Sequence, residues 1–297
     1  MRVVVRAPAT IANLGPGFDC LGVAIAWYNE IRVERDPSGE LTVTAAGEGA
    51  DAIPRDDSNL AVRAMSSVLG DPRGVRVHLT NAIPFGRGFG SSAAAIVGGL
   101  VAARAFTADA DAWDADMLIH IGAALEGHAD NVAPCVLGGA VVTGGSTAKP
   151  LGVPSGLSLL VCVSPTPLAT EAARRALPRQ VSFEDAAATA GRAALLAASL
   201  ATGDSARLLD ATEDALHQPA RFELMPASGS LVAALRRERM AAFLAGAGPS
   251  VAALIGEGEE SEAESLANRL APDGWDVRTV AIDRSGAAVV ETAPSLA

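Results

Sequence analysis

Apolar and polar positions alternate over some short segments of the chain and recur at helical spacing over others. Alternation and short apolar runs predict strands at residues 2–6, 21–34, 40–46, 75–80, 136–143, 157–164, 250–255 and 286–291. Helical spacing predicts helices at residues 59–69, 91–106, 116–126, 168–176, 183–202, 204–217, 228–240 and 259–270. Because these elements mix without a regular βαβ rhythm, we expect an α+β fold.

Local signals refine this picture at three places. Asp57 or Ser58 is the expected N-cap of the first helix, and Gly70 is its expected stop. The segment at 40–46 is expected to be the hairpin partner of the strand before it. A run of Gly, Ser and Thr at 144–147, followed by two prolines, predicts a boundary between domains at 1–152 and 153–297.

The bulk composition narrows the classes of protein that fit. The chain has 297 residues, a formal net charge of −11 and three widely spaced cysteines. It has no apolar run long enough to span a membrane and no signal-peptide pattern at its start. The acidity argues against a nucleic-acid partner, and the cysteine pattern suits a reducing cytoplasm. We therefore expect a cytoplasmic protein that binds neither nucleic acid nor membrane.

The most informative motif is a glycine-rich segment before the helix at 91–106, here called the glycine loop (residues 84–92). Three glycines alternate with other residues, and Ser91 and Ser92 follow. Backbone N–H groups in such a loop can surround an anion at a helix N-terminus. The P-loop pattern does not fit, because the one lysine, Lys149, lies far away, and the dinucleotide-binding spacing is also absent. Taken alone, the loop could equally be a tight turn.

A second constellation lies between the first two predicted strands. Residues 7–20 are rich in Gly and Pro, so we expect a loop there that presents Asn13 and Asp19. An Asn and an Asp that only stabilise turns are the alternative.

Two further segments combine polar groups with tight turns. In residues 126–134, Glu126 ends a helix and His128, Asp130 and Asn131 follow; a metal site would need a second nearby histidine, which is missing. A second Gly-rich turn occupies residues 246–250 and is here called the C-terminal glycine turn. By themselves, this turn and the scattered Arg174 and Arg221 fit ordinary turn and surface roles. The other histidines, His78, His120 and His217, are interpreted as structural.

Taken in order along the chain, these segments resemble the motifs of the GHMP superfamily (galactokinase, homoserine kinase, mevalonate kinase and phosphomevalonate kinase). The similarity lies in residues 13–17, the glycine loop and the C-terminal glycine turn. Within the superfamily, residues 7–19 and 126–134 are most similar to the homoserine kinase branch. The chain departs from the usual pattern at Ile11, Phe89, Ala129 and Ala247, and the last of these removes a hydroxyl near the glycine loop.

The resemblance implies a two-domain GHMP kinase fold, with an N-terminal domain like domain 2 of ribosomal protein S5 and a ferredoxin-like C-terminal domain. It implies an enzyme that transfers phosphate from ATP to the hydroxyl of L-homoserine, giving O-phospho-L-homoserine and ADP, in threonine biosynthesis. Relatives often form dimers, which leaves a homodimer open. Two alternatives remain: a GHMP kinase acting on another small molecule such as mevalonate or shikimate, and an inactive binding paralogue.

The resemblance also assigns roles to residues. Glu126 and Ser92 would hold Mg²⁺, and Asn131 would orient the attacking hydroxyl without a dedicated base. L-homoserine would contact Asn13, Asp19, His128, Thr170, Arg174 and Arg221. ATP would contact Pro84, Phe85, Gly86, Arg87, Gly88, Phe89, Gly90, Ser91, Ser92, Ala93, Ala94, Asn59 and Gly248.

Overall fold

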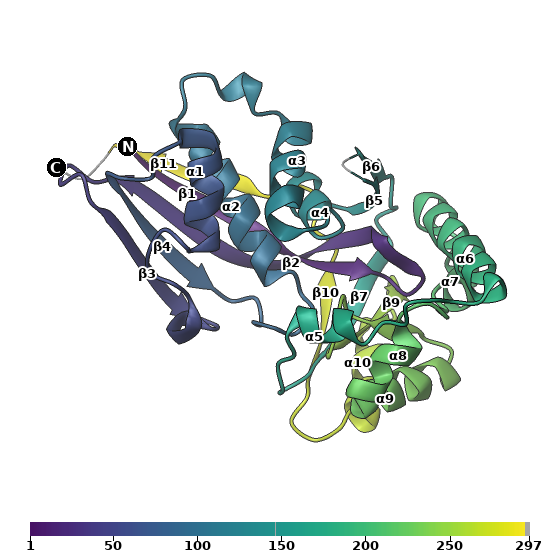
Figure 1. Ribbon diagram of the computed structural model, residues 1–297. Coiled ribbons are helices and arrows are strands. Elements are labelled where there is room, and N and C mark those ends of the chain that lie inside the picture. The colour runs from purple at the N-terminus through teal and green to yellow at the C-terminus, as the bar shows by residue number, and fades with distance from the viewer. Residues whose placement is uncertain (146, 295–297) are drawn as a thin grey trace.

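The computed structural model describes residues 1–145 and 147–294, which form two lobes, each built around one β-sheet (Figure 1). Residue 146 of the predicted boundary segment and residues 295–297 of the predicted second domain lie outside the described residues. The observed mixture of helices with two largely antiparallel sheets confirms the predicted α+β class.

The first lobe contains a sheet of seven strands, counted over the described residues. Its order is β11-β1-β2-β4-β3, with β5 and β6 attached through β2. The strands are β1 (Arg2–Asn13), β2 (Gly17–Arg35), β3 (Leu41–Gly47), β4 (Val75–Asn81), β5 (Ala140–Gly144), β6 (Thr147–Leu151) and β11 (Ala288–Ala293). Helices cover one face of this sheet, as Figure 1 shows: α1 (Leu60–Leu69), α2 (Ser91–Phe106), α3 (Ala115–Glu126) and α4 (Val132–Leu137).

The second lobe carries an antiparallel sheet of order β10-β7-β9-β8. Its strands are β7 (Leu157–Val163), β8 (Ala241–Leu244), β9 (Val251–Gly256) and β10 (Asp276–Ala281). Its helices are α5 (Thr170–Arg175), α6 (Phe183–Thr202), α7 (Leu208–Ala211), α8 (Gln218–Leu224), α9 (Pro226–Arg237) and α10 (Glu260–Leu270). The strand order and the helices placed before β8 and after β9 are those of a ferredoxin-like domain. Short 3₁₀ turns complete the chain: Ala50–Ala52, Ala110–Ala112 and Ser205–Arg207.

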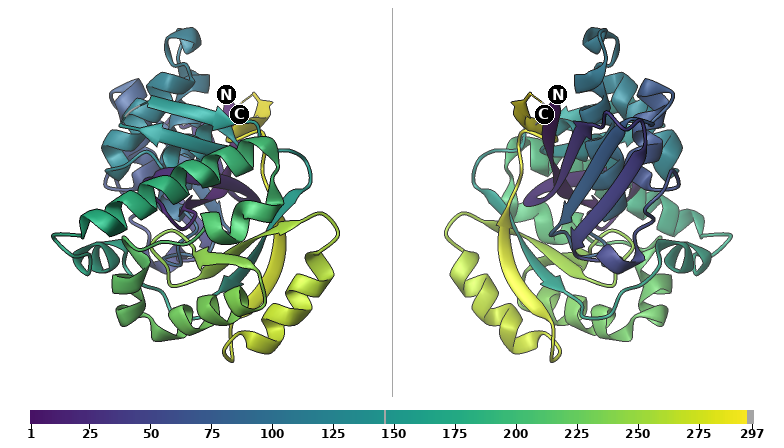
Figure 2. Two further views of the ribbon diagram at one scale, coloured as in Figure 1. Left: turned by 90° about the vertical axis from the view of Figure 1, so that its right-hand side faces the viewer. Right: turned by 90° about the vertical axis from the view of Figure 1, so that its left-hand side faces the viewer.

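The two lobes share a hydrophobic core. One cluster of buried side chains runs from Val5 and Ile11 of β1 to Leu159 of β7 and Phe243 of β8. The chain also crosses back at its end, because β11 pairs with β1 in the first sheet (Figure 2). Dividing the chain after residue 152 therefore assigns the strands of the two sheets to separate segments, except that β11 belongs to the first sheet. None of the described helices is long and apolar enough to cross a membrane.

Several predicted elements are confirmed, among them the helices at α2, α6 and α10, while the expected loop at 7–20 is wrong. Strand β1 continues to Asn13 and β2 begins at Gly17, so only residues 14–16 join them. From Ala7 to Asn13 every residue of β1 is buried. A strand covered on both faces shows no polar alternation, and its small residues then look like a turn.

The predicted hairpin at 40–46 is also wrong. Strand β3 does not pair with β2 but lies parallel to β4, with Leu41 opposite Val75 and Gly47 opposite Asn81. The chain reaches β4 through helix α1, which makes the unit a β-α-β crossover. Period-two alternation identifies a strand but not its partner, so the pairing could not be taken from the pattern.

Two predicted elements are interrupted in the structure. The strand predicted at 136–143 is the end of α4 followed by β5 from Ala140, because a short apolar run fits a buried helix as well as a strand. In place of the helix predicted at 204–217, a short 3₁₀ turn leads into α7, which ends at Ala211. Asp214 then accepts hydrogen bonds from the backbone N–H groups of residues 216–218 at the start of α8. Strands β6, β8 and β10 were not predicted; of these, β6 and β8 are short, with five and four residues.

The N-cap of α1 is Asn59 rather than Asp57 or Ser58, whereas Gly70 is confirmed as its C-cap. The Asn59 side chain accepts from the backbone N–H groups of Ala61 (3.0 Å) and Val62 (3.4 Å). Its amide nitrogen donates to the carbonyl of Pro54 at 2.9 Å. The side chain is buried, so these contacts replace its hydration.

We expect Asn59→Ala to lower the free energy of unfolding by about 1–2 kcal/mol, because two helix N–H groups lose their acceptor. Ser58→Ala is the matched control, since Ser58 is exposed and its side chain bonds, among the described residues, to Asp56 alone. Its effect should stay within about 0.5 kcal/mol. Chemical denaturation of the two variants measures the difference, and equal losses would contradict the assignment of Asn59 as the cap.

Candidate active site

The glycine loop connects β4 to α2 and lies between the lobes. Gly90 caps α2 with φ 63°, and a Cβ there would lie 2.0 Å from Thr10 Oγ1. Gly88 has φ 87°, and its Cβ would lie 2.0 Å from the carbonyl oxygen of Ala245 in the second lobe. Only glycine meets both the left-handed conformation and the close approach at these positions. The loop is therefore fixed against β1 on one side and the C-terminal glycine turn on the other.

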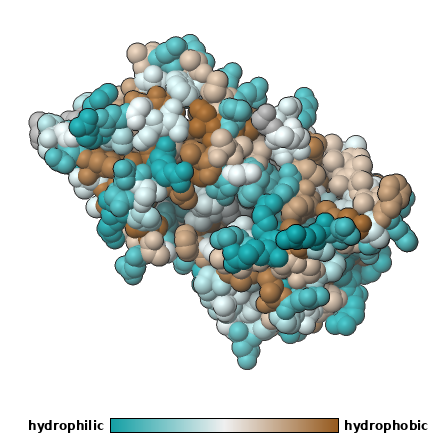
Figure 3. Space-filling model, in the orientation of Figure 1, coloured by the Kyte–Doolittle hydropathy of each residue, from teal (hydrophilic) through white to brown (hydrophobic). Residues whose placement is uncertain are grey.

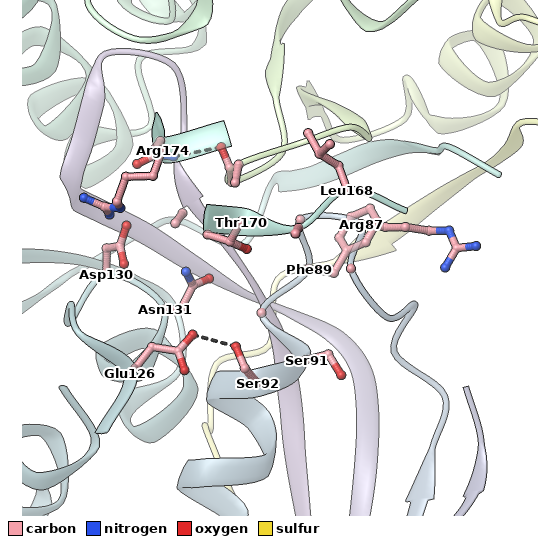
Figure 4. Close-up of a pocket in the computed structure, with 18 of the residues that line it drawn as sticks. Arg87, Phe89, Ser91, Ser92, Glu126, Asp130, Asn131, Leu168, Thr170 and Arg174 are labelled. Carbon is pink, nitrogen blue, oxygen red and sulfur yellow. Dashed lines mark hydrogen bonds between the residues drawn. The ribbon is translucent and has the colours of Figure 1, made fainter. Parts of the chain in front are cut away.

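The N-terminus of α2 opens into a cavity of about 290 Å³ between the lobes. On the face shown in Figure 3, the surface is hollowed between the two lobes. Most of the residues assigned from the sequence line this cavity (Figure 4). They are Asn13, Asp19, Pro84, Phe85, Gly86, Arg87, Gly88, Phe89, Gly90, Ser91, Ser92, Glu126, His128, Asn131, Thr170, Arg174 and Arg221.

Ser92 and Glu126 form the oxygen-rich end of the cavity. Ser92 Oγ donates to Glu126 Oε1 at 2.6 Å, from the first turn of α2 to the last residue of α3. Burial raises the pKa of Glu126, while the Ser92 hydrogen bond and the His128 charge oppose the rise. A carboxylate held in this way stabilises a cation beside it, because its own ionised form lacks full hydration.

Asn131 lies beside this pair with its amide oriented by Thr10. Thr10 Oγ1 donates to Asn131 Oδ1 at 2.8 Å, which leaves the Nδ2 group as the donor available to a ligand. Nearby, His128 Nδ1 lies 2.7 Å from Asp130 Oδ1, and this contact raises the pKa of His128. Asp130 is itself buried and lines the cavity. From the sequence, Asp130 was weighed only as a possible metal ligand and was not predicted to lie in the cleft.

The opposite end of the cavity carries an ion pair. Arg174 of α5 donates to both carboxylate oxygens of Asp19, at 2.8 and 3.0 Å. The backbone N–H of Asp19 donates to Asn13 Oδ1 at 3.1 Å, and Asn13 Nδ2 donates to the carbonyl of Gly246 at 2.8 Å. The side chain of Asn13 therefore holds the backbone of Asp19 in place.

Arg221 is buried next to this ion pair, and His217 orients it. Arg221 Nη1 donates to His217 Nδ1 at 3.0 Å and to the carbonyl of Gly246 at 3.2 Å. His217 Nε2 must then carry the ring proton, and it donates to the carbonyl of Gly15 at 2.7 Å. Burial lowers the pKa of His217 to about 4, so the ring stays neutral, and burial lowers the pKa of Arg221 to about 10.

Phe18 completes the arginine end of the cleft. Its ring lies 5.6 Å from the guanidinium carbon of Arg174, 5.4 Å from that of Arg221 and 5.2 Å from the His217 ring. Cation–π contact with one ring aligns both guanidinium groups. Phe18 was not predicted as a site residue, and His217 was interpreted only as structural. The signal available for His217 is its position four residues before Arg221, at the N-cap of α8.

Four residues assigned to ATP do not line the cavity. Asn59 is the buried cap of α1, and Ala93 and Ala94 are buried in α2 behind the loop. Gly248 lies next to the loop, while Gly246 and Ala247 line the cavity in its place. Arg87 lines the cavity, but its guanidinium points away from Ser92 and Glu126 (Figure 4).

Comparisons with known proteins agree with this architecture. The family model for the GHMP kinase N-terminal domain matches residues 59–139, and that for the GHMP kinase C-terminal region matches residues 194–275. A homoserine kinase of Streptomyces avermitilis is 44% identical over 98% of this chain and 96% of its own length. One from Caldicellulosiruptor bescii is 39% identical over 97% of this chain and 96% of its own length.

Solved structures show the same similarity. The crystal structure of a homoserine kinase from Cytophaga hutchinsonii superposes with a TM-score of 0.84 at 26% identity, covering 97% of each chain. The L. major mevalonate kinase structure shares the fold, with a TM-score of 0.69 at 16% identity over 95% of this chain and 96% of that one. The family resemblance and the two-domain fold that it implied are thereby confirmed: this chain belongs to the homoserine kinases of the GHMP kinase family.

Proposed function

We propose that this protein transfers the γ-phosphoryl group of ATP to the hydroxyl of L-homoserine, giving O-phospho-L-homoserine and ADP. The observation that carries the proposal is the arrangement of charges in one cavity. Arg174, which binds Asp19, lies on one side of Asn131, and Ser92 with Glu126 at the start of α2 lies on the other (Figure 4). Arg221 also lines this cavity. An amino acid with a distal alcohol fits between these two sides.

The glycine loop and α2 would bind the phosphates of ATP. Unpaired backbone N–H groups of the first helical turn and the positive end of the helix dipole favour anions at this position. Since the contacts of Gly88 and Gly90 fix the loop before any ligand binds, little conformational entropy is lost when a phosphate arrives.

Ser92 and Glu126 fit a magnesium ion. Their hydroxyl and carboxylate oxygens are hard ligands 2.6 Å apart, facing the phosphate site. The described residues contain no cluster of three or more His, Cys, Asp and Glu that would form an all-protein metal cage. Mg²⁺ keeps several waters and uses phosphate oxygens as ligands, so two protein ligands suffice. When bound, the ion would neutralise charge on the β- and γ-phosphates.

The ion pair of Asp19 and Arg174 would open for the substrate. The ammonium of L-homoserine provides a counter-ion for Asp19, and its carboxylate provides one for Arg174 and Arg221. Exchanging one ion pair for two leaves no charge unpaired. Mevalonate and shikimate have no ammonium, so either would release Arg174 while leaving Asp19 without its partner. His128 and Thr170, which also line the cavity, would contact the substrate between its two ends.

Asn131 would orient the substrate hydroxyl toward the phosphate. Its free Nδ2 group can donate to the hydroxyl oxygen, but an amide cannot accept the proton. In a loose phosphoryl-transfer transition state the hydroxyl loses its proton late, so position and charge stabilisation matter more than a base.

The direct test is an ADP-release assay with ATP, Mg²⁺ and L-homoserine, mevalonate, shikimate or no acceptor. We expect turnover that depends on L-homoserine. Turnover with another alcohol would contradict the substrate assignment. ATP binding without turnover on any acceptor would indicate an inactive binding protein.

Arg174→Ala should raise the KM for L-homoserine by about 10- to 100-fold, since a hydrogen bond to a charged group contributes about 1.5–3 kcal/mol. The KM for ATP should change little. Arg175→Ala is the matched control, because the adjacent Arg175 is exposed and pairs with Glu171 on its own helix. An unchanged KM for L-homoserine in Arg174→Ala, or equal effects of the two variants, would contradict the role of Arg174.

Glu126→Gln separates stability from activity. Because burial raises the pKa of Glu126, its ionised form is disfavoured in the folded protein. Without ligands, we expect the Tm of Glu126→Gln to exceed that of the wild type above this pKa. The difference should vanish as the pH falls and Glu126 takes up a proton.

The same variant should lower kcat by about 10²–10³, the typical cost of one group that stabilises developing charge. The exposed Glu223→Gln is the control and should leave both quantities unchanged. A Glu126→Gln variant of normal kcat would contradict the role of Glu126.

A further inference from the structure

Arg87 is the one charged residue of the glycine loop, and its guanidinium points away from Ser92 and Glu126 (Figure 4). Its guanidinium donates to three backbone carbonyls: Nε to Ser164 at 2.7 Å, Nη2 to Pro165 at 2.9 Å and Nη1 to Phe85 at 2.9 Å. Glu48 lies at 4.0 Å from Nη1. Three donors of one planar group are thus committed to the protein backbone rather than to a phosphate.

Two of these carbonyls belong to the second lobe, in the segment that leads from β7 to α5. The same segment is tied to the glycine loop a second time, because the backbone N–H of Leu168 donates to the carbonyl of Gly86 at 2.8 Å. It is also tied to the C-terminal glycine turn, since the N–H of Ser164 donates to Ser250 Oγ at 3.1 Å. Residues 164–169, here called the strap, are therefore fixed by the loop that would hold the phosphates.

The strap ends where the proposed substrate residues begin. Thr170 starts α5, and Arg174 lies on the next turn of that helix with its guanidinium on Asp19. Nucleotide bound on the glycine loop would thus hold Arg87 and the strap in the arrangement seen here, and through them Arg174. Lysine could not replace this contact, because an ammonium is a point charge without the planar arrangement of donors.

We propose that Arg87 is a positioning residue that couples nucleotide binding to the homoserine end of the cleft. This inference rests on the proposed function for the identity of the acceptor. Coupling of this kind is measured as the factor by which one ligand changes the affinity for the other.

The test is calorimetric titration of L-homoserine with and without Mg²⁺ and a non-hydrolysable β,γ-imido analogue of ATP. We expect the analogue to tighten L-homoserine binding at least about 5-fold in the wild type, the lower end of typical couplings. The factor should fall to about 1 in Arg87→Ala and in Arg87→Lys.

Arg284→Ala is the matched control. Arg284 also joins backbone carbonyls, those of Val153 (2.6 Å) and Pro154 (2.7 Å), but it does not line the cavity. It should keep the coupling factor of the wild type. A wild type without coupling, an unchanged factor in either Arg87 variant, or an equal loss in Arg284→Ala would overturn the inference.

Hydrogen exchange of residues 166–172 gives an independent readout that needs no acceptor. We expect the ATP analogue to protect this segment in the wild type but not in Arg87→Ala, and equal protection in both would overturn the inference. If the wild type binds no L-homoserine at all, the proposed function fails, and the exchange experiment alone decides the role of Arg87.

Discussion

The carbonyl of Gly246 is the point at which the two lobes and the site meet. It accepts from Asn13 of β1 and from Arg221 of α8, while the preceding carbonyl, of Ala245, lies where a side chain on Gly88 would be. One turn of the second lobe therefore positions Arg221, the Asn13 side chain that holds Asp19, and the glycine loop. Any change in this turn would move both ends of the cleft together.

The charged groups of the cleft have protein partners before a ligand binds. Arg174 pairs with Asp19, and His128 lies against Asp130. Arg221 exchanges hydration for contacts with a neutral histidine, a carbonyl and an aromatic face. The chain is strongly acidic as a whole, so affinity for a polyphosphate must come from this local arrangement rather than from net charge. The neutral state of His217 is necessary, because a protonated ring could not accept from Arg221.

The sequence predicted those parts of the site that are local in the chain. The glycine loop, Glu126 and Asn131 stand in continuous motifs, so they could be selected as site candidates without coordinates, and they do line one cavity. The roles of Arg87 and His217 depend on partners 77 and 202 positions away, and no local pattern encodes such contacts. The same limit explains the fold: α2 was recognised from its apolar spacing, whereas the parallel pairing of β3 with β4 depends on the crossover between them. The buried half of β1 was read as a loop because both of its faces are covered.

Phe89, one of the positions at which the chain departs from the family pattern, takes part in the contact between the lobes. The Phe89 ring is buried and lies 5.6 Å from the ring of Trp27 on β2. Trp27 in turn lies beneath Arg278 of β10, whose guanidinium carbon is 4.6 Å from the ring centre. Phe89, Trp27 and Arg278 thus form a column from the glycine loop through the first sheet to the second. Since aromatic and cation–π contacts add to the area that the ring buries, this column ties the loop to both lobes. The glycines define the conformation of the loop. Its position between the two sheets depends on residues outside the motif, namely Trp27 and Arg278.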